Sequence, residues 1–135
     1  MQPKIKNVIA ILAGLIIGSI VNMMIIIIGN KIIPLPPGTD TSTAEGLKAA
    51  LPLFKLEHFI VPFLAHALGT FAGALLATFI AATHKKTIAF VIGCAFLIGG
   101  ITMIIQVPSP IMFTLIDLLF AYIPMALMAY KIVRK

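Results

Sequence analysis

The chain has 135 residues, of which 61% are hydrophobic and only 10% are charged, and its mean hydropathy is +1.15. This composition excludes a soluble globular domain, because there is too little polar surface to cover an apolar core in water. The formal net charge of +6 does not indicate nucleic-acid binding, since the basic residues form small clusters at the ends of apolar segments. We therefore expect one membrane domain over residues 1–135, with the lipid bilayer as its partner and no nucleic acid.

The first apolar segment covers residues 8–29 and follows Lys4 and Lys6. A segment of this length can cross the hydrocarbon core, which is about 30 Å thick. A signal peptide starts in a similar way, but no small-residue cleavage site precedes a polar mature domain here. We predict a retained membrane span.

A polar connection follows over residues 30–57 and contains the one short helix that we predict outside the spans. Ser42 and Glu45 have the spacing of a capping box, with Ser42 as the N-cap. Pro52 should end or kink this helix. Its apolar side chains recur at helical spacing, so we expect it to lie flat on the outer surface as a lid, the alternative being a poorly ordered loop. These side chains are Leu47, Ala50, Leu51 and Phe54.

Three further apolar segments cover residues 59–83, 87–107 and 111–130. Only His84, Lys85 and Lys86 separate the first two, which leaves room for little more than a tight turn between antiparallel helices. Two prolines, Pro108 and Pro110, stop one helix and start the next. The predicted fold class is therefore an all-α integral membrane protein with four transmembrane helices in an antiparallel bundle.

The distribution of lysine and arginine predicts the orientation of this bundle. One side carries seven of these residues and the other carries three, which places the seven in the cytoplasm. We expect a multi-pass protein of the cell membrane with both termini cytoplasmic. The seven are Lys4, Lys6, Lys85, Lys86, Lys131, Arg134 and Lys135, and the three are Lys31, Lys48 and Lys55.

Small residues recur at every fourth position in the first two spans. This spacing lets helix backbones approach closely, which is a main source of attraction between helices in lipid. We predict a tight pair between residues 8–29 and 59–83, and the competing use of either row is a homo-oligomer contact. The first row is Ala10, Gly14, Gly18 and Asn22, and the second is Ala65, Gly69, Gly73 and Ala77.

Polar side chains inside the spans fall at one depth. Asn22, His66 and Asp117 each lie about seven residues, or roughly 10 Å, from the outer end of their span. Because ionisable groups in a bilayer are costly, they often mark ion or substrate paths. One hypothesis is therefore a protonatable or ligand-binding site open to the outer side, which would include three polar residues nearer the boundary, Glu57, His58 and Gln106.

Two other interpretations of these polar residues stand beside that hypothesis. Asn22, His66 and Asp117 can serve only as interhelical hydrogen bonds, each contributing about 0.6 kcal/mol on average in membrane helices. Alternatively, Asp117 faces a partner subunit.

The sequence contains no motif typical of an enzyme active site, a metal site or a cofactor site. The single cysteine, Cys94, lies in an apolar segment and cannot form an intrachain disulfide. We expect no enzymatic activity, no cofactor and no metal. Two function hypotheses follow: a proton-responsive transporter or permeation unit, and a non-catalytic accessory or scaffold subunit of a larger membrane complex.

Overall fold

The computed structural model describes residues 1–135 and confirms the all-α class, with 80% of residues in helices and no strands. Four helical segments are long and apolar enough to cross a membrane. The elements are α1 (Pro3–Ile32), α2 (Ala44–Ala50), two 3₁₀ helices (Leu51–Leu53 and Leu56–Phe59), α3 (Ile60–Ile80), α4 (Lys85–Gln106), α5 (Ile111–Phe120) and α6 (Ile123–Val133).

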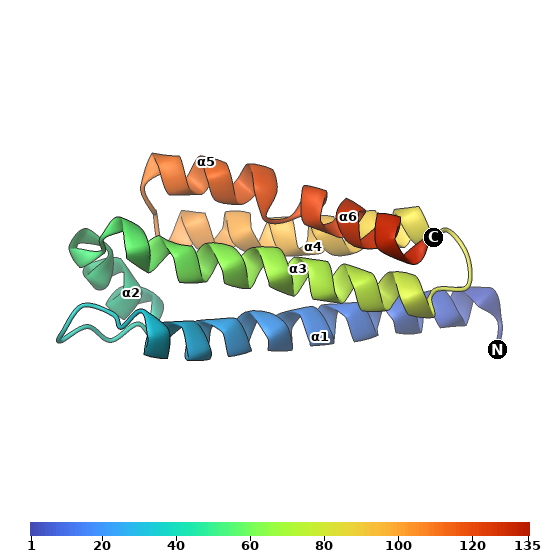
Figure 1. Ribbon diagram of the computed structural model, residues 1–135, viewed down its shortest axis with the longest axis horizontal. Coiled ribbons are helices and arrows are strands. Elements are labelled where there is room, and N and C mark those ends of the chain that lie inside the picture. Colours follow the sequence, from blue (N-terminus) through green and yellow to red (C-terminus); the bar gives the residue numbers. More distant parts are fainter.

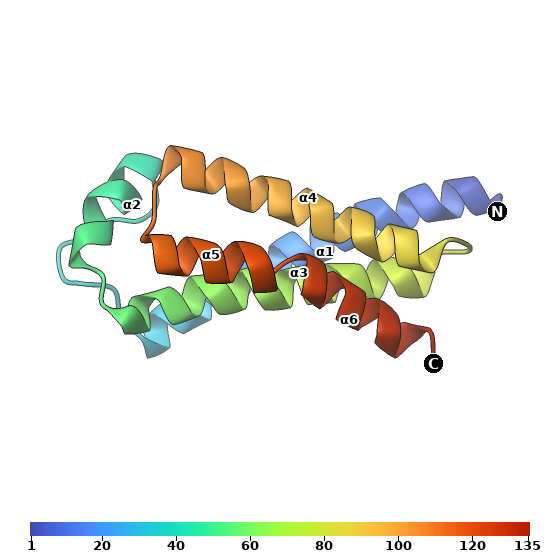
Figure 2. The same ribbon diagram turned by 90° about the horizontal axis from the view of Figure 1, so that it is seen from above.

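The long helices lie side by side in an elongated molecule (Figure 1). Both termini lie at one end, together with the short connection between α3 and α4 (Figures 1 and 2). The opposite end holds α2 and the connection between α4 and α5.

The helices α1 and α3 pack along their rows of small residues. A β-carbon added to Gly14 would lie 2.6 Å from the Gly73 carbonyl oxygen, and one added to Gly18 would lie 2.7 Å from that of Gly69. Such distances are shorter than a van der Waals contact allows, so only glycine fits at these positions. The two backbones therefore touch directly, as the four-residue spacing predicts.

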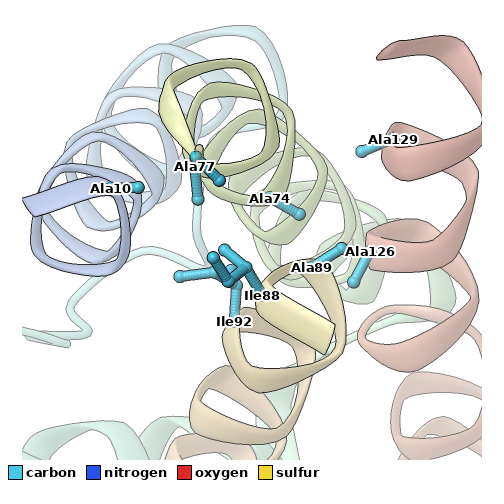
Figure 3. Packing of buried hydrophobic residues seen from close by; sticks show 9 residues of the cluster. Ala10, Ala74, Ala77, Ile88, Ala89, Ile92, Ala126 and Ala129 are labelled. Carbon is cyan, nitrogen blue, oxygen red and sulfur yellow. The ribbon is translucent and has the colours of Figure 1, made fainter. Parts of the chain in front are cut away.

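Alanines and isoleucines fill the core in the half of the molecule that holds the termini (Figure 3). They come from α1, α3, α4 and α6, and their short side chains allow these helices to pack closely. The cluster comprises Ala10, Ala74, Ala77, Ala81, Ile88, Ala89, Ile92, Ala126 and Ala129.

The fourth apolar segment differs from the single helix that we predicted over residues 111–130. It consists of two helices, α5 and α6, separated at Ala121 and Tyr122. Pro124 causes part of this break, because proline has no N–H to donate to the carbonyl of Phe120 one turn earlier. Tyr122 has a non-helical backbone, with φ −114° and ψ −83°.

Other predicted helix ends also differ: the first span is longer at both ends, and the third begins at Lys85. The second span ends at Ile80 rather than Thr83, because Asn7 of α1 accepts the backbone N–H groups of Ala82 and Thr83 through its side-chain oxygen. The N-cap of the short loop helix is Thr43 and not Ser42.

The hydrogen bonds of the loop explain the change of N-cap. Thr43 Oγ1 accepts the backbone N–H of Gly46, while both the hydroxyl and the N–H of Ser42 donate to Asp40. The serine is thus held in a turn with Asp40 that precedes the helix. These bonds also hold the pKa of Asp40 below its usual range, because donors stabilise the ionised carboxylate.

Candidate functional site

The helix α5 buries a single side chain, and that side chain is a carboxylate. Of its ten residues, only Asp117 is buried, with 2% of its surface exposed. An ionisable group removed from water in this way requires partners, because its charged form is otherwise strongly disfavoured.

Both oxygens of the Asp117 carboxylate have a hydrogen-bond partner. His66 Nδ1 on α3 lies 2.8 Å from Oδ1, and the Tyr122 hydroxyl donates to Oδ2 over 3.0 Å. The imidazole and phenol rings also stack, with centroids 5.7 Å apart. We call these three residues the Asp117 cluster.

The break between α5 and α6 allows Tyr122 to reach Asp117. In a continuous helix, residues five apart do not face each other, whereas residues three or four apart do. The regular hydrogen bonds stop with Ala121 N–H donating to the Asp117 carbonyl and resume with Ala126 N–H donating to the Tyr122 carbonyl. The irregular backbone between them turns the Tyr122 ring back toward the carboxylate.

A glycine on α4 provides the space for the Tyr122 hydroxyl. A β-carbon added to Gly100 would overlap that hydroxyl, and it would also lie 2.7 Å from the phenol Cζ atom. By contrast, a β-carbon on the adjacent Gly99 would meet nothing within 4 Å. The position of the hydroxyl therefore depends on the missing side chain at Gly100 specifically.

Both hydrogen bonds of this cluster are compatible with an ionised Asp117. In that state the Tyr122 hydroxyl donates to one carboxylate oxygen, and His66 donates an Nδ1–H to the other. The second ring nitrogen of His66, Nε2, makes no hydrogen bond, and the side chain is 25% exposed. The cluster therefore presents one unpaired ring nitrogen on the far side of the imidazole from the buried carboxylate.

Asn22 does not join this cluster, although its predicted depth matches. It lies on α1 against Gly69 of α3, and it forms no hydrogen bond with His66 or Asp117. His66 belongs to a row one residue away from the glycine row, or about 100° around the helix. The side of α3 that contacts α1 is therefore not the side that carries the imidazole.

The three residues predicted near the outer boundary also lie outside the cluster. Glu57 and Gln106 are exposed. His58 is buried, but both of its ring nitrogens serve the loop: Nδ1 accepts the Lys55 N–H over 2.8 Å, and Nε2 donates to the Pro34 carbonyl over 3.1 Å. These bonds fix the connection between α1 and α3.

Sequence reasoning missed Tyr122, although one signal for it was present. Pro124 lies two residues later, and a proline within an apolar segment disrupts the helix around it. The cluster itself offers one imidazole and one carboxylate as ligand-type side chains, and no group of three or more His, Cys, Asp or Glu residues gathers anywhere in the structure.

No protein-family model matches the chain, and no curated protein or solved structure matches it.

Proposed function

We propose that the chain is a multi-pass membrane protein whose four apolar segments cross the bilayer in antiparallel order. The two termini and the α3–α4 connection share one end of the molecule (Figure 1). That end carries seven lysines and arginines and no acidic residue, whereas Asp40, Glu45 and Glu57 lie in the connection at the other end. By the positive-inside rule, the end with the termini faces the cytoplasm.

Within that frame, we propose that the protein is a proton-responsive transporter or permeation unit. The observation that carries this proposal is the burial of Asp117 inside an apolar segment, hydrogen-bonded to a histidine that keeps one free ring nitrogen. Ionisable groups at such depth commonly belong to proton relays. A discontinuous helix beside them is also a recurrent feature of transporter binding sites.

The cluster can pass a proton by breaking and forming only N–H and O–H bonds. A proton that arrives at His66 Nε2 forms an imidazolium, and the Nδ1 proton can then move to Asp117 Oδ1. The imidazole is neutral again and the carboxyl group is protonated. This step weakens the hydrogen bonds that attach α5, because a protonated carboxyl group accepts less strongly than a carboxylate.

Proton uptake by proteoliposomes tests this function. With a pH-sensitive dye inside and a valinomycin potassium potential, vesicles with the wild-type protein should acidify faster than protein-free vesicles. Asp117→Asn should reduce the rate to that of protein-free vesicles, because the amide cannot take up the proton. Thr102→Val is the matched control, since Thr102 is exposed and bonds only to the Ile98 carbonyl of its own helix.

Two results would overturn the proposal. One is a wild-type rate no higher than that of empty vesicles, and the other is a wild-type rate in Asp117→Asn.

A second function, an accessory or scaffold subunit of a larger membrane complex, is favoured by the exposure of α1. Only Ala10, Gly14 and Gly18 are buried among its thirty residues. A partner helix could cover the apolar surface that remains. The scaffold function predicts stoichiometric co-purification with another membrane protein in mild detergent, and isolation of the chain alone would count against it.

A further inference from the structure

Thr70 on α3 differs from Thr78 and Thr102 in how it uses its hydroxyl. It is fully buried, and Oγ1 has no hydrogen-bond partner. A threonine in a helix commonly donates to the carbonyl four residues earlier. Thr78 does so to Ala74 over 2.6 Å, and Thr102 does so to Ile98 over 2.8 Å. A buried hydroxyl without any partner is costly, so its presence calls for an explanation.

The position of Thr70 associates it with the Asp117 cluster. It follows His66 by one helical turn, and at about 100° per residue it falls between the directions of His66 and Ala67. His66 stacks on the Tyr122 ring, and Ala67 belongs to the same small apolar cluster as Tyr122. Thr70 therefore faces the same side of the bundle as the two residues that hold the phenol ring.

The depth of Thr70 matches that of the break between α5 and α6. From the level at which His66 meets Asp117, Thr70 is four residues further along α3, and Tyr122 is five residues further along the fourth segment. These offsets correspond to about 6 Å and 7.5 Å at helical rise. One turn beyond Thr70, Ala74 belongs to the core of alanines and isoleucines (Figure 3). Thr70 is thus the last unpaired polar group before that apolar core.

We propose that Thr70 is the inner end of the same site, where its hydroxyl holds a water molecule that exchanges protons with the Asp117 cluster. This inference rests on the proposed function and adds the direction of the path. A proton enters at His66 Nε2, moves from Nδ1 to Asp117 and leaves to the water at Thr70. One proton enters and one leaves, and the carboxylate is ionised again. The imidazole is neutral but now carries its proton on Nε2, so the ring must reorient and exchange this proton with water before Nε2 can accept another.

Paired substitutions at Thr70 test its role in proton movement. Thr70→Val keeps the shape of the side chain and removes the hydroxyl, and Thr70→Ser keeps the hydroxyl. We expect Thr70→Val to lower the proton uptake rate about tenfold, which corresponds to about 1.4 kcal/mol in the barrier. Thr70→Ser should keep most of the wild-type rate, and so should Thr102→Val. A wild-type rate in a folded Thr70→Val protein would overturn the inference.

Thiol labelling tests for water at Thr70 without requiring transport. In a Cys94→Ala background, Thr70→Cys should react with a small charged methanethiosulfonate reagent, because the reaction needs a hydrated thiolate. Ile92→Cys is the control, since Ile92 is equally buried but lies in the apolar core. It should remain unreactive under the same conditions.

The two measurements separate the inference from the proposed function. If the wild-type protein moves no protons but the Thr70→Cys variant reacts and the Ile92→Cys variant does not, the transport function fails and the hydrated position at Thr70 stands. If protons move but the Thr70→Cys variant is as unreactive as the Ile92→Cys variant, the transport function stands and Thr70 has no part in it.

Discussion

The contact between α1 and α3 and the contact that attaches α5 use opposite physical means. In the first, glycines bring two backbones together over successive turns, so that Gly14 meets Gly73 and Gly18 meets Gly69. In the second, the only buried residue of the helix is Asp117, which is held by hydrogen bonds from His66 on α3 and from Tyr122 at the break between α5 and α6. Backbone contact is fixed by shape alone, whereas the polar contact depends on protonation.

This difference suggests a division of roles between the two contacts. The α1–α3 pair resists relative displacement, because a shift of either helix separates a whole row of contacts. Outside the cluster, the Phe113 ring of α5 lies 5.0 Å from that of Phe59 next to α3, and Leu118 packs against the small apolar cluster of Ala67, Ala121 and Tyr122. A helix attached at so few points is the part of the molecule best suited to move when Asp117 gains or loses a proton.

Gly73→Ala should cause the largest effect, and it tests the backbone contact. The new β-carbon would press directly on the Gly14 carbonyl oxygen. Because backbone on the opposite helix cannot move aside cheaply, we expect a loss of about 1–3 kcal/mol in the free energy of unfolding. Titration from mild detergent into SDS measures this loss.

Gly99→Ala provides the matched control for that substitution. Its β-carbon meets nothing within 4 Å, so the change should give only the gain in helix propensity, up to about 1 kcal/mol. Equal stability of the two variants would show that the α1–α3 contact does not depend on close approach at glycine.

Gly100→Ala tests the polar contact through its neighbour. The added methyl group would displace the Tyr122 hydroxyl and so break its hydrogen bond to Asp117. We expect a loss of stability up to about 1.7 kcal/mol, the upper value for a hydrogen bond between membrane helices, together with slower proton uptake. Gly99→Ala on the adjacent residue should cause neither loss. A Gly100→Ala protein with the wild-type uptake rate would remove Tyr122 from the mechanism.

The same contrast explains how far the sequence could be interpreted. The α1–α3 contact depends on a local pattern, small residues at every fourth position, which is visible in each segment separately. The Asp117 cluster depends on the rotation of α3 relative to the fourth segment and on the break within that segment. The shared depth of His66 and Asp117 could be counted from the ends of their spans, but no count could show that Asn22 faces the other side of α3.

The role of Tyr122 could not be predicted from helical periodicity, for a further reason. A residue five positions after Asp117 points elsewhere in a regular helix, and it reaches the carboxylate only because Pro124 interrupts the hydrogen bonds. Gly100 was equally hidden, because its neighbour Gly99 has the same identity but different surroundings. Sequence periodicity describes regular helices, and the site lies where a helix is irregular.

Tyr122→Phe should give a smaller effect, and it separates the hydroxyl from the ring. The ring can still stack on His66, so only one hydrogen bond is lost, at a cost of about 0.6 kcal/mol. Titration from mild detergent into SDS measures this loss, and a Tyr122→Phe protein as stable as wild type would contradict the assignment of the hydroxyl as a donor.

The smallest expected effect is that of acid on the loop carboxylate Asp40. Unlike Asp117, this carboxylate is exposed. Asp40 accepts both the hydroxyl and the N–H of Ser42, which holds its pKa below the usual range. Because the folded pKa is depressed, this stabilisation is complete above the unfolded value and is lost as the pH falls through the folded value. The Ser42 amide resonance should therefore titrate with a midpoint below about 3.9.

Asp40→Asn should abolish this titration while leaving proton uptake unchanged. A midpoint at or above that value would mean that the turn does not form in solution, and a loss of uptake in Asp40→Asn would mean that the loop is coupled to the Asp117 cluster.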